Sequence, residues 1–291
     1  MPAFTQFANV MISGVLTGTI YGLMALGLSA IFGVMRLVNF AHGEVMLLAM
    51  YAAVVGFERL GLDPFLAMPL AALVFAAGGY ALQRGFINRF IRRPEHAQML
   101  IMIALATIVT NGLLLVFGPD ARSVQPPYAL DSFAWGPLLI DKVRLYAAFA
   151  AVAATALLAA FFRWTLTGKA IRACADNPLG ARVAGLPVAR LYAITFGLGA
   201  ACVAVAGCAM VPLVDVTPTL GPAYTLLAFV IVIVGGLGSM VGALCGGLLI
   251  GVSEALAGTL IAPSAKSMVS FGLLIVVLLV RPQGLFGTAR T

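Results

Sequence analysis

Long runs without any charge dominate this chain and restrict the folds that it can adopt. Residues 7–32 form 26 consecutive uncharged and mostly apolar positions, and a helix needs about 20 such residues to cross a bilayer. Hydrophobic residues make up 62 % of the 291 residues and charged residues 9 %, whereas soluble domains contain about 45–50 % and about 25 %. The chain therefore exposes apolar surface to lipid along most of its length.

Charge clusters and prolines divide this apolar sequence into eight candidate spans, and the period-2 alternation of strands is absent. Most of the spans are close to the roughly 17–25 residues that a transmembrane helix needs. We therefore predict one all-α, polytopic membrane domain over residues 1–291, with about eight transmembrane or partly re-entrant helices. The spans are 7–32, 38–57, 65–82, 99–117, 145–162, 191–213, 224–252 and 268–280.

Three of these spans depart from a simple helix. Residues 38–57 carry three polar side chains in their first two turns, which favours a broken or re-entrant element. Residues 224–252 are rich in glycine, so that either one tilted helix or two half-helices separated near 235–239 would fit. Residues 268–280 would extend only about 20 Å as a helix.

The net charge of +7 is unevenly distributed between the connections. Residues 84–96 carry +3 and residues 163–190 carry +4, whereas residues 119–144 are neutral. The positive-inside rule then predicts that the two basic connections face the cytoplasm, and that 119–144, 215–222 and the N-terminus face outside. Two arginines after residue 280 favour a cytoplasmic C-terminus. The basic residues are not interleaved with aromatic ones, so no nucleic-acid partner is expected.

The cysteines and the N-terminus give two further expectations. Cys174 falls in a predicted cytoplasmic connection, and the other three cysteines fall in apolar segments, so a disulfide framework has no support. The first basic residue is Arg36, so no basic region precedes the first span and a cleaved signal peptide is not expected.

Glycines recur at helical spacing in the first and in the late spans. Gly14, Gly18 and Gly22 lie on one helical face, and the pairs Gly242/Gly246 and Gly247/Gly251 repeat the spacing. Small residues at this spacing let helix backbones approach in lipid. They predict tight packing within this subunit, with a subunit interface as the alternative.

A polar run interrupts the apolar sequence between the first two spans. Arg36, Asn39, His42 and Glu44 lie within nine positions, with Phe40 among them, and such polar side chains are costly in a membrane unless they lie at a helix end, an interface or a polar cavity. They are candidates for a translocation path or gate. The alternative is structural: Asn39 caps a helix, Arg36 extends to the interface, and Glu44 pairs with Arg36 or a neighbour.

Asp215 and Glu254 are expected to be interface residues at membrane edges.

The second basic connection contains a pattern typical of a short helix. Asp176 or Asn177 would cap it, Pro178 would take its first turn, and Gly185 would end it. Small apolar positions such as Ala181 would fit a groove on another protein; an ordinary interfacial loop helix is the alternative. The residues of this candidate docking element are Asp176, Asn177, Pro178, Leu179, Ala181, Arg182 and Gly185.

Catalytic and metal-binding patterns are absent from the sequence. It contains no H-E-x-x-H, no Cys-x-x-Cys, no G-x-S-x-G and no G-x-x-x-x-G-K-[ST] phosphate loop. No His, Cys, Asp and Glu cluster has the spacing of metal ligands. We therefore expect that the chain is not an enzyme, does not hydrolyse ATP itself, and needs no cofactor or metal.

Four blocks resemble one known family. Residues 22–44 (GLMALGLSAIFGVMRLVNFAHGE), 166–207, 235–243 and 281–287 are similar, in this order, to the permease subunits of branched-chain amino-acid ABC importers, the LivH-type family. The resemblance implies a multi-pass subunit of a bacterial inner membrane that translocates branched-chain or related amino acids by ATP-driven alternating access. It also implies that 163–190 is the coupling loop. The implied partners are a second homologous permease, two cytoplasmic ATPase subunits, a periplasmic substrate-binding protein and membrane lipid.

Three other functions remain open from the sequence. A permease for urea, amides or aromatic acids would have the same fold. A secondary carrier should show acids at span centres or inverted repeats, and neither is evident. An intramembrane enzyme would need a nucleophile and base or a metal set, which the sequence lacks.

Overall fold

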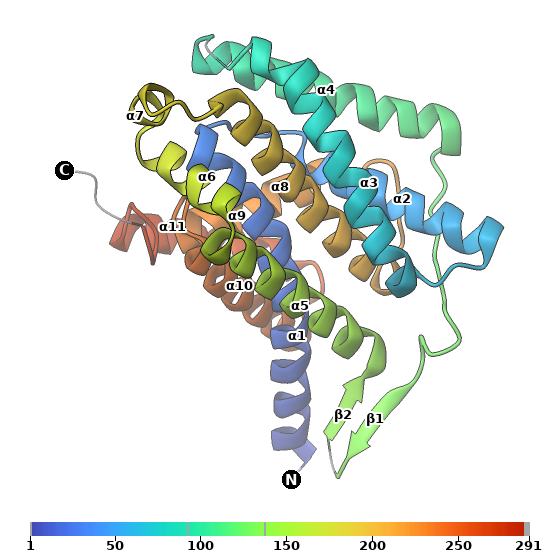
Figure 1. Ribbon diagram of the computed structural model, residues 1–291. Helices are drawn as coiled ribbons and strands as arrows, with labels where there is room; N and C mark the ends of the chain where they lie inside the picture. The colour runs from blue at the N-terminus through green and yellow to red at the C-terminus, as the bar shows by residue number, and fades with distance from the viewer. Residues whose placement is uncertain (1, 92, 137, 288–291) are drawn as a thin grey trace.

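The computed structural model describes residues 2–91, 93–136 and 138–287, and helices form most of it (Figure 1). This arrangement confirms the all-α prediction. In order, the elements are α1 (Pro2–Met35), α2 (His42–Leu60), α3 (Pro64–Gly85), the short 3₁₀ helix η1 (Ile87–Arg89), α4 (Glu95–Phe117), β1 (Ser132–Trp135), β2 (Leu138–Asp141), α5 (Lys142–Trp164), α6 (Leu166–Asp176), α7 (Pro178–Val183), α8 (Val188–Met210), the 3₁₀ helix η2 (Val211–Leu213), α9 (Gly221–Gly235), α10 (Met240–Leu260) and α11 (Ala265–Val280).

Within the described residues, six helices are long and apolar enough to cross a membrane: α1, α3, α4, α5, α8 and α10. The predicted span 224–252 is in fact two helices, α9 and α10, separated at residues 236–239. The predicted separation near 235–239 is therefore confirmed, but only α9 is short, because α10 is by itself long enough to span a membrane. The break uses Gly236 and Gly238, whose φ angles of 108° and 82° are rarely adopted by other residues. The predicted span 268–280 is the short helix α11.

A feature that the sequence did not predict is the β-hairpin of β1 and β2. Its strands pair antiparallel from Ser132↔Asp141 to Trp135↔Leu138, and Lys142 closes its open end through an ion pair of 2.7 Å with Asp131. The hairpin lies beside the N-terminus at one end of the bundle (Figure 1), where the amide of Leu139 donates to the Asn9 side chain over 3.1 Å.

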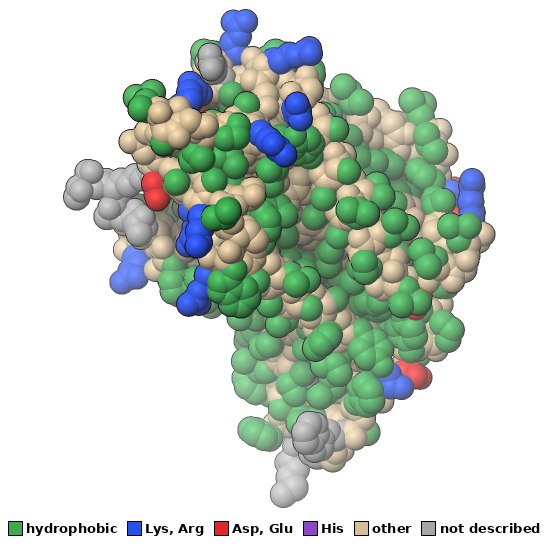
Figure 2. Space-filling view, viewed as in Figure 1, with side chains coloured by type: hydrophobic (Ala, Val, Ile, Leu, Met, Phe, Trp, Pro, Cys, Tyr) green, Lys and Arg blue, Asp and Glu red, His purple; other side chains and the backbone are tan. Residues whose placement is uncertain are grey.

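The connections separate into two groups, as the charges predicted. At the hairpin end, Arg122 pairs through its backbone with Val216 and through its side chain with Glu58. At the opposite end, the Asn88 side chain donates to the carbonyl of Ala189 over 3.1 Å, which joins the two basic connections. Lysine and arginine side chains surround that end, whereas the flanks are mostly hydrophobic (Figure 2). The side of the membrane that each end faces stays a prediction.

The glycine stripes pack α1 against α10. A Cβ added at Gly18 would lie 2.8 Å from Leu248 Cα, and one added at Gly247 would lie 2.4 Å from Gly22 Cα. Such backbone contact is possible only because both helices present glycines at the same level. The interpretation as packing within the subunit is therefore confirmed for this stripe.

Candidate functional site

The polar run marks a break between α1 and α2. After Met35 the chain leaves helical geometry at Arg36, whose φ is +53°, and α2 begins only at His42. The Nε2 atom of His42 lies 3.0 Å from the carbonyl oxygen of Met24, which is about three turns, or 16 Å, before the end of α1. Residues 36–41 thus run back along α1, and α2 starts deep inside the bundle. The predicted break before α2 is confirmed, whereas a re-entrant course through the membrane stays a prediction.

The start of α2 meets the start of α9 at this depth. The Thr225 hydroxyl donates to Glu44 Oε2 over 3.0 Å, and the amide of Gly43 donates to the same Thr225 oxygen over 2.8 Å. Both side chains are buried, with Glu44 2 % and Thr225 4 % exposed. One hydroxyl therefore links a carboxylate and a helix N-terminus that lie 181 and 182 positions away in the chain, respectively.

Two glycines make this crossing possible. A Cβ at Gly43 would lie 2.1 Å from the carbonyl oxygen of Gly221 and 2.5 Å from the amide nitrogen of Thr225. A Cβ at Gly221 would lie 3.0 Å from Glu44 Cγ. The two helices thus touch through their backbones, and the Glu44 side chain occupies the space that a side chain at position 221 would need.

A cavity of about 400 Å³ lies between this crossing and α4. Glu44 and Thr225 form one wall, and α4 contributes threonine and asparagine side chains to the other. The Asn111 side chain donates to the carbonyl of Thr107 over 2.8 Å, which leaves its amide oxygen available. The lining is Phe40, Glu44, Ile103, Ala106, Thr107, Thr110, Asn111, Pro222, Thr225 and Leu226.

The structure divides the five candidate gate residues into three groups. Phe40 and Glu44 line the cavity beside α4. Asn39 and His42 are buried and position the turn, since the Asn39 side chain accepts from the amide of Ala41 over 3.1 Å. Arg36 lies instead in another cavity with Asp176, at the end that carries the basic connections. The expectation that Glu44 pairs with Arg36 is therefore wrong, because Thr225 is its partner.

The predicted short helix is α7. Asn177 caps it by accepting from the amide of Gly180 over 2.8 Å, Pro178 takes its first turn, and Gly185 follows its end with a φ of +81°. Asp176 is the last residue of α6 rather than the cap.

One expectation about α7 is wrong. The side chain of Ala181 is only 6 % exposed and packs inside its own chain, so it cannot form a docking face. Leu179 and Val183 point outward instead, 71 % and 85 % exposed, and Arg182 is exposed between them. The sequence pattern could not give this orientation, because α6 and α8 determine which face of so short a helix is covered.

The four cysteines are free. In α6, outside the predicted spans, burial raises the pKa of the Cys174 thiol, so this thiol stays protonated and unreactive near neutral pH. Within the part of the chain that the structure describes, no group of three His, Cys, Asp or Glu side chains could hold a metal ion.

Sequence reasoning missed Thr225, the polar residues of α4 and the position of Glu254. Glu254 is the only charged residue between Asp215 and Lys266, which is the signal that could have identified it. Asp215 is exposed as expected of an interface residue, but Glu254 is partly buried and accepts hydrogen bonds from Tyr21 and Ser270.

Comparison with known proteins gives a consistent result. Residues 10–278 match the family model described as branched-chain amino acid transport system, permease component. The chain belongs to this family. The permease LivH of Escherichia coli K12 is 32 % identical over 303 residues, which cover 98 % of this chain and 96 % of LivH. The permease BraD of Pseudomonas aeruginosa is 31 % identical, with 99 % and 98 % covered.

A third relative is similar at lower identity. A probable branched-chain amino acid transport permease protein LivH of Methanocaldococcus jannaschii is 25 % identical over 277 residues, covering 91 % of this chain and 88 % of the relative. The matched residues 10–278 extend from α1 into α11, so the membrane domain as a whole carries the likeness. The chain is a multi-pass membrane protein of a transport permease family.

Proposed function

We propose that this chain is a membrane-spanning subunit of a binding-protein-dependent ABC importer in a bacterial inner membrane. It translocates branched-chain or related amino acids by ATP-driven alternating access. The family match over residues 10–278 carries this proposal. The chain has no phosphate loop of its own, so ATP hydrolysis belongs to two cytoplasmic ATPase subunits. A second homologous permease and a periplasmic substrate-binding protein complete the assembly.

The crossing of α2 and α9 forms one wall of the translocation path in this proposal. A path needs polar groups at membrane depth, and Glu44, Thr225 and Asn111 surround one cavity there. Broken helices whose ends meet inside the bilayer are typical of transport sites. α4 covers this cavity only loosely, since few of its residues are buried, and the second permease subunit supplies the facing wall.

Substitution of Glu44 and Thr225 tests this path. Thr225→Val would leave the Glu44 carboxylate and the Gly43 amide without their partner, a loss of about 1–3 kcal/mol for each buried group. Glu44→Gln would remove the charge at nearly constant volume. We expect both complexes to assemble and to transport more slowly than the matched control Glu58→Gln, whose carboxylate pairs with Arg122 on the surface. Normal uptake by both variants would contradict the assignment.

Coupling to the ATPases takes place at α7 in this proposal. Leu179, Arg182 and Val183 give it an exposed face with apolar and basic character. α6 connects it to the bundle, because Ile171 and Cys174 are fully buried against the spans. Closure of the ATPases would thus displace α7 and α6 together and move α5 and α8, the helices on either side.

A hydrolysis measurement tests the class of transporter. The purified chain should hydrolyse no ATP, and activity should appear when its partner ATPase subunits are added. Robust ATP turnover by the isolated chain, free of contaminating ATPases, would refute the proposal. Competition of uptake by urea, amides or aromatic acids, but not by leucine, would instead reassign the substrate while leaving the importer class intact.

A further inference from the structure

A second polar cavity lies at the hairpin end of the bundle, away from the crossing of α2 and α9. It measures about 260 Å³ and lies between α1, the start of α5, the end of α8 and the α10–α11 turn. This is slightly below the roughly 300–1,000 Å³ of drug-sized pockets, so the cavity suits a small solute. Its charged lining residues are one acid, Glu254, and two bases, Arg144 and Lys266.

The acid is held in place but not neutralised. The Tyr21 hydroxyl donates to Glu254 Oε2 over 3.1 Å, and the Ser270 hydroxyl donates to Oε1 over 2.7 Å. A carboxylate has about four acceptor positions, so each oxygen can still accept another hydrogen bond. Among the described residues, no ammonium or guanidinium nitrogen lies within 4.0 Å of this carboxylate. Glu254 therefore has no direct ion-pair partner among the described residues and can accept a further hydrogen bond from a solute in the cavity.

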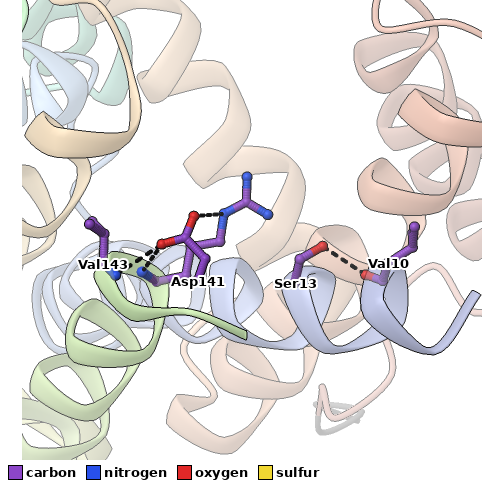
Figure 3. A network of polar contacts seen from close by, with 5 residues as sticks. Val10, Ser13, Asp141 and Val143 are labelled. Carbon is purple, nitrogen blue, oxygen red and sulfur yellow. Dashed lines mark hydrogen bonds and ion pairs between the residues drawn. The ribbon is translucent and has the colours of Figure 1, made fainter. Parts of the chain in front are cut away.

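The two bases lie on other walls of the same cavity. Arg144 is turned toward Asp141, with its Nε atom 3.7 Å from Asp141 Oδ2, and this buried Nε has no hydrogen-bond partner among the described residues. Figure 3 shows the Asp141 carboxylate bound to the amide of Val143 at the start of α5, and the Ser13 hydroxyl on α1 donating to the carbonyl of Val10. Ser13 also lines the cavity. The Lys266 side chain lies over Gly258, since a Cβ there would meet its Cε at 2.7 Å.

A third wall is apolar. The cavity is lined there by three uncharged side chains from the end of α8, from η2 and from the residue after η2: Met210, Leu213 and Val214. The cavity thus combines a free carboxylate, two cationic side chains, hydroxyl groups and an aliphatic surface. An α-amino acid with an aliphatic side chain carries the complementary groups: an ammonium, a carboxylate and a hydrocarbon chain.

We propose that this cavity binds an aliphatic α-amino acid as a zwitterion. Its ammonium group donates to Glu254, its carboxylate is bound by Arg144 and Lys266, and its side chain contacts Met210, Leu213 and Val214. This inference rests on the proposed function, since it assigns an outer binding site to the same class of substrate. A solute that lacks either ionic group binds more weakly, because it loses the charge-assisted hydrogen bonds to one side of the cavity.

Binding to the full chain in lipid nanodiscs tests the inference. Leucine should bind saturably, whereas 4-methylpentanoate, which lacks the ammonium, and 3-methylbutylamine, which lacks the carboxylate, should compete at least ten-fold more weakly, or about 1.4 kcal/mol. Glu254→Gln and Lys266→Gln should each weaken leucine binding at least ten-fold, while Glu58→Gln at the surface should not change it. Elution of each variant as a single peak confirms that it is folded.

Two outcomes overturn the inference: no saturable leucine binding at millimolar concentration, or equal competition by the two analogues. Unchanged binding by Glu254→Gln would also overturn it. Uptake by the complete wild-type complex separates this failure from failure of the proposed function. If that complex imports leucine while binding is independent of Glu254, the function stands and the cavity assignment fails. If the cavity binds leucine and the complex imports none, the cavity assignment stands and the proposed function fails.

Discussion

Gly43→Ala should disrupt the crossing of α2 and α9, although it adds only one methyl group. The new Cβ would lie 2.1 Å from the Gly221 carbonyl oxygen, 2.5 Å from the Thr225 amide nitrogen and 2.7 Å from the Thr225 hydroxyl. Favourable contacts between heavy atoms lie at about 3.5–4.0 Å, so α9 would have to move by more than 1 Å. Two of the three atoms belong to the backbone and cannot rotate away.

The cost should therefore reach the upper end of the roughly 1–3 kcal/mol that overpacking of a core typically costs. At about 2–4 °C per kcal/mol for a chain of this size, the melting temperature should fall by about 6–12 °C. Gly56→Ala is the matched control, because it lies in the same helix and a Cβ there has nothing within 4 Å. Alanine in a helix interior is about 0.5–1 kcal/mol more favourable than glycine, so this control should melt at or above the wild-type temperature.

Heating followed by fluorescence-detected size-exclusion chromatography in detergent measures both variants. Loss of the monodisperse peak gives the melting temperature of each protein. Equal melting of Gly43→Ala and Gly56→Ala would refute the claim that α2 and α9 meet through their backbones. Transport by the assembled complex should fall with Gly43→Ala as well, since the Thr225 bond to Glu44 depends on the same approach.

Three further predictions concern the two ends of the molecule. Single cysteines introduced at Asn88 and Ser123 should react with an impermeant reagent in whole cells only at Ser123, and the reverse pattern would overturn the topology. Leu179→Asp, on the exposed face of α7, should reduce the ATPase subunits recovered with the complex, while Leu130→Asp, at an even more exposed leucine of the opposite end, should not; equal recovery would exclude α7 as the docking element. Burial and a hydrogen bond of 2.5 Å to Asp63, the residue that caps α3, raise the pKa of Tyr128. The protonated tyrosine therefore stabilises the fold fully below about pH 10, and this stabilisation is lost as the pH rises further. Thermal stability should therefore decline above about pH 10 and decline less in Tyr128→Phe, and identical profiles would contradict this.

The sequence predicted most of the helices because uncharged runs and turn residues are local signals. The break before α2 followed from the polar residues between 36 and 44, and the bounds of α7 followed from Asn177 and Pro178. The division of 224–252 stayed open, since glycines are compatible with one tilted helix as well as with two half-helices. Only the structure shows that Gly236 and Gly238 take positive φ angles there.

The rest depended on contacts between distant parts of the chain. Nothing near Glu44 in the sequence indicates that its partner is Thr225, because no local pattern encodes a pairing across 181 positions. The burial of Ala181 likewise depends on the helices that pack around α7. The sequence predicts Glu254 to be a membrane-edge residue, because its position at the end of an apolar run is a local signal. Its hydrogen-bond donors, Tyr21 and Ser270, come from two other helices and leave no such signal.

Uptake of radiolabelled leucine into proteoliposomes tests the central claim most directly. The vesicles would contain this chain, the second permease and the ATPases, with the binding protein supplied outside and ATP enclosed. We predict accumulation of leucine that requires both ATP hydrolysis and the binding protein and that persists when ion gradients are collapsed. Accumulation by this chain alone, driven by a proton or sodium gradient without ATP, would contradict the account.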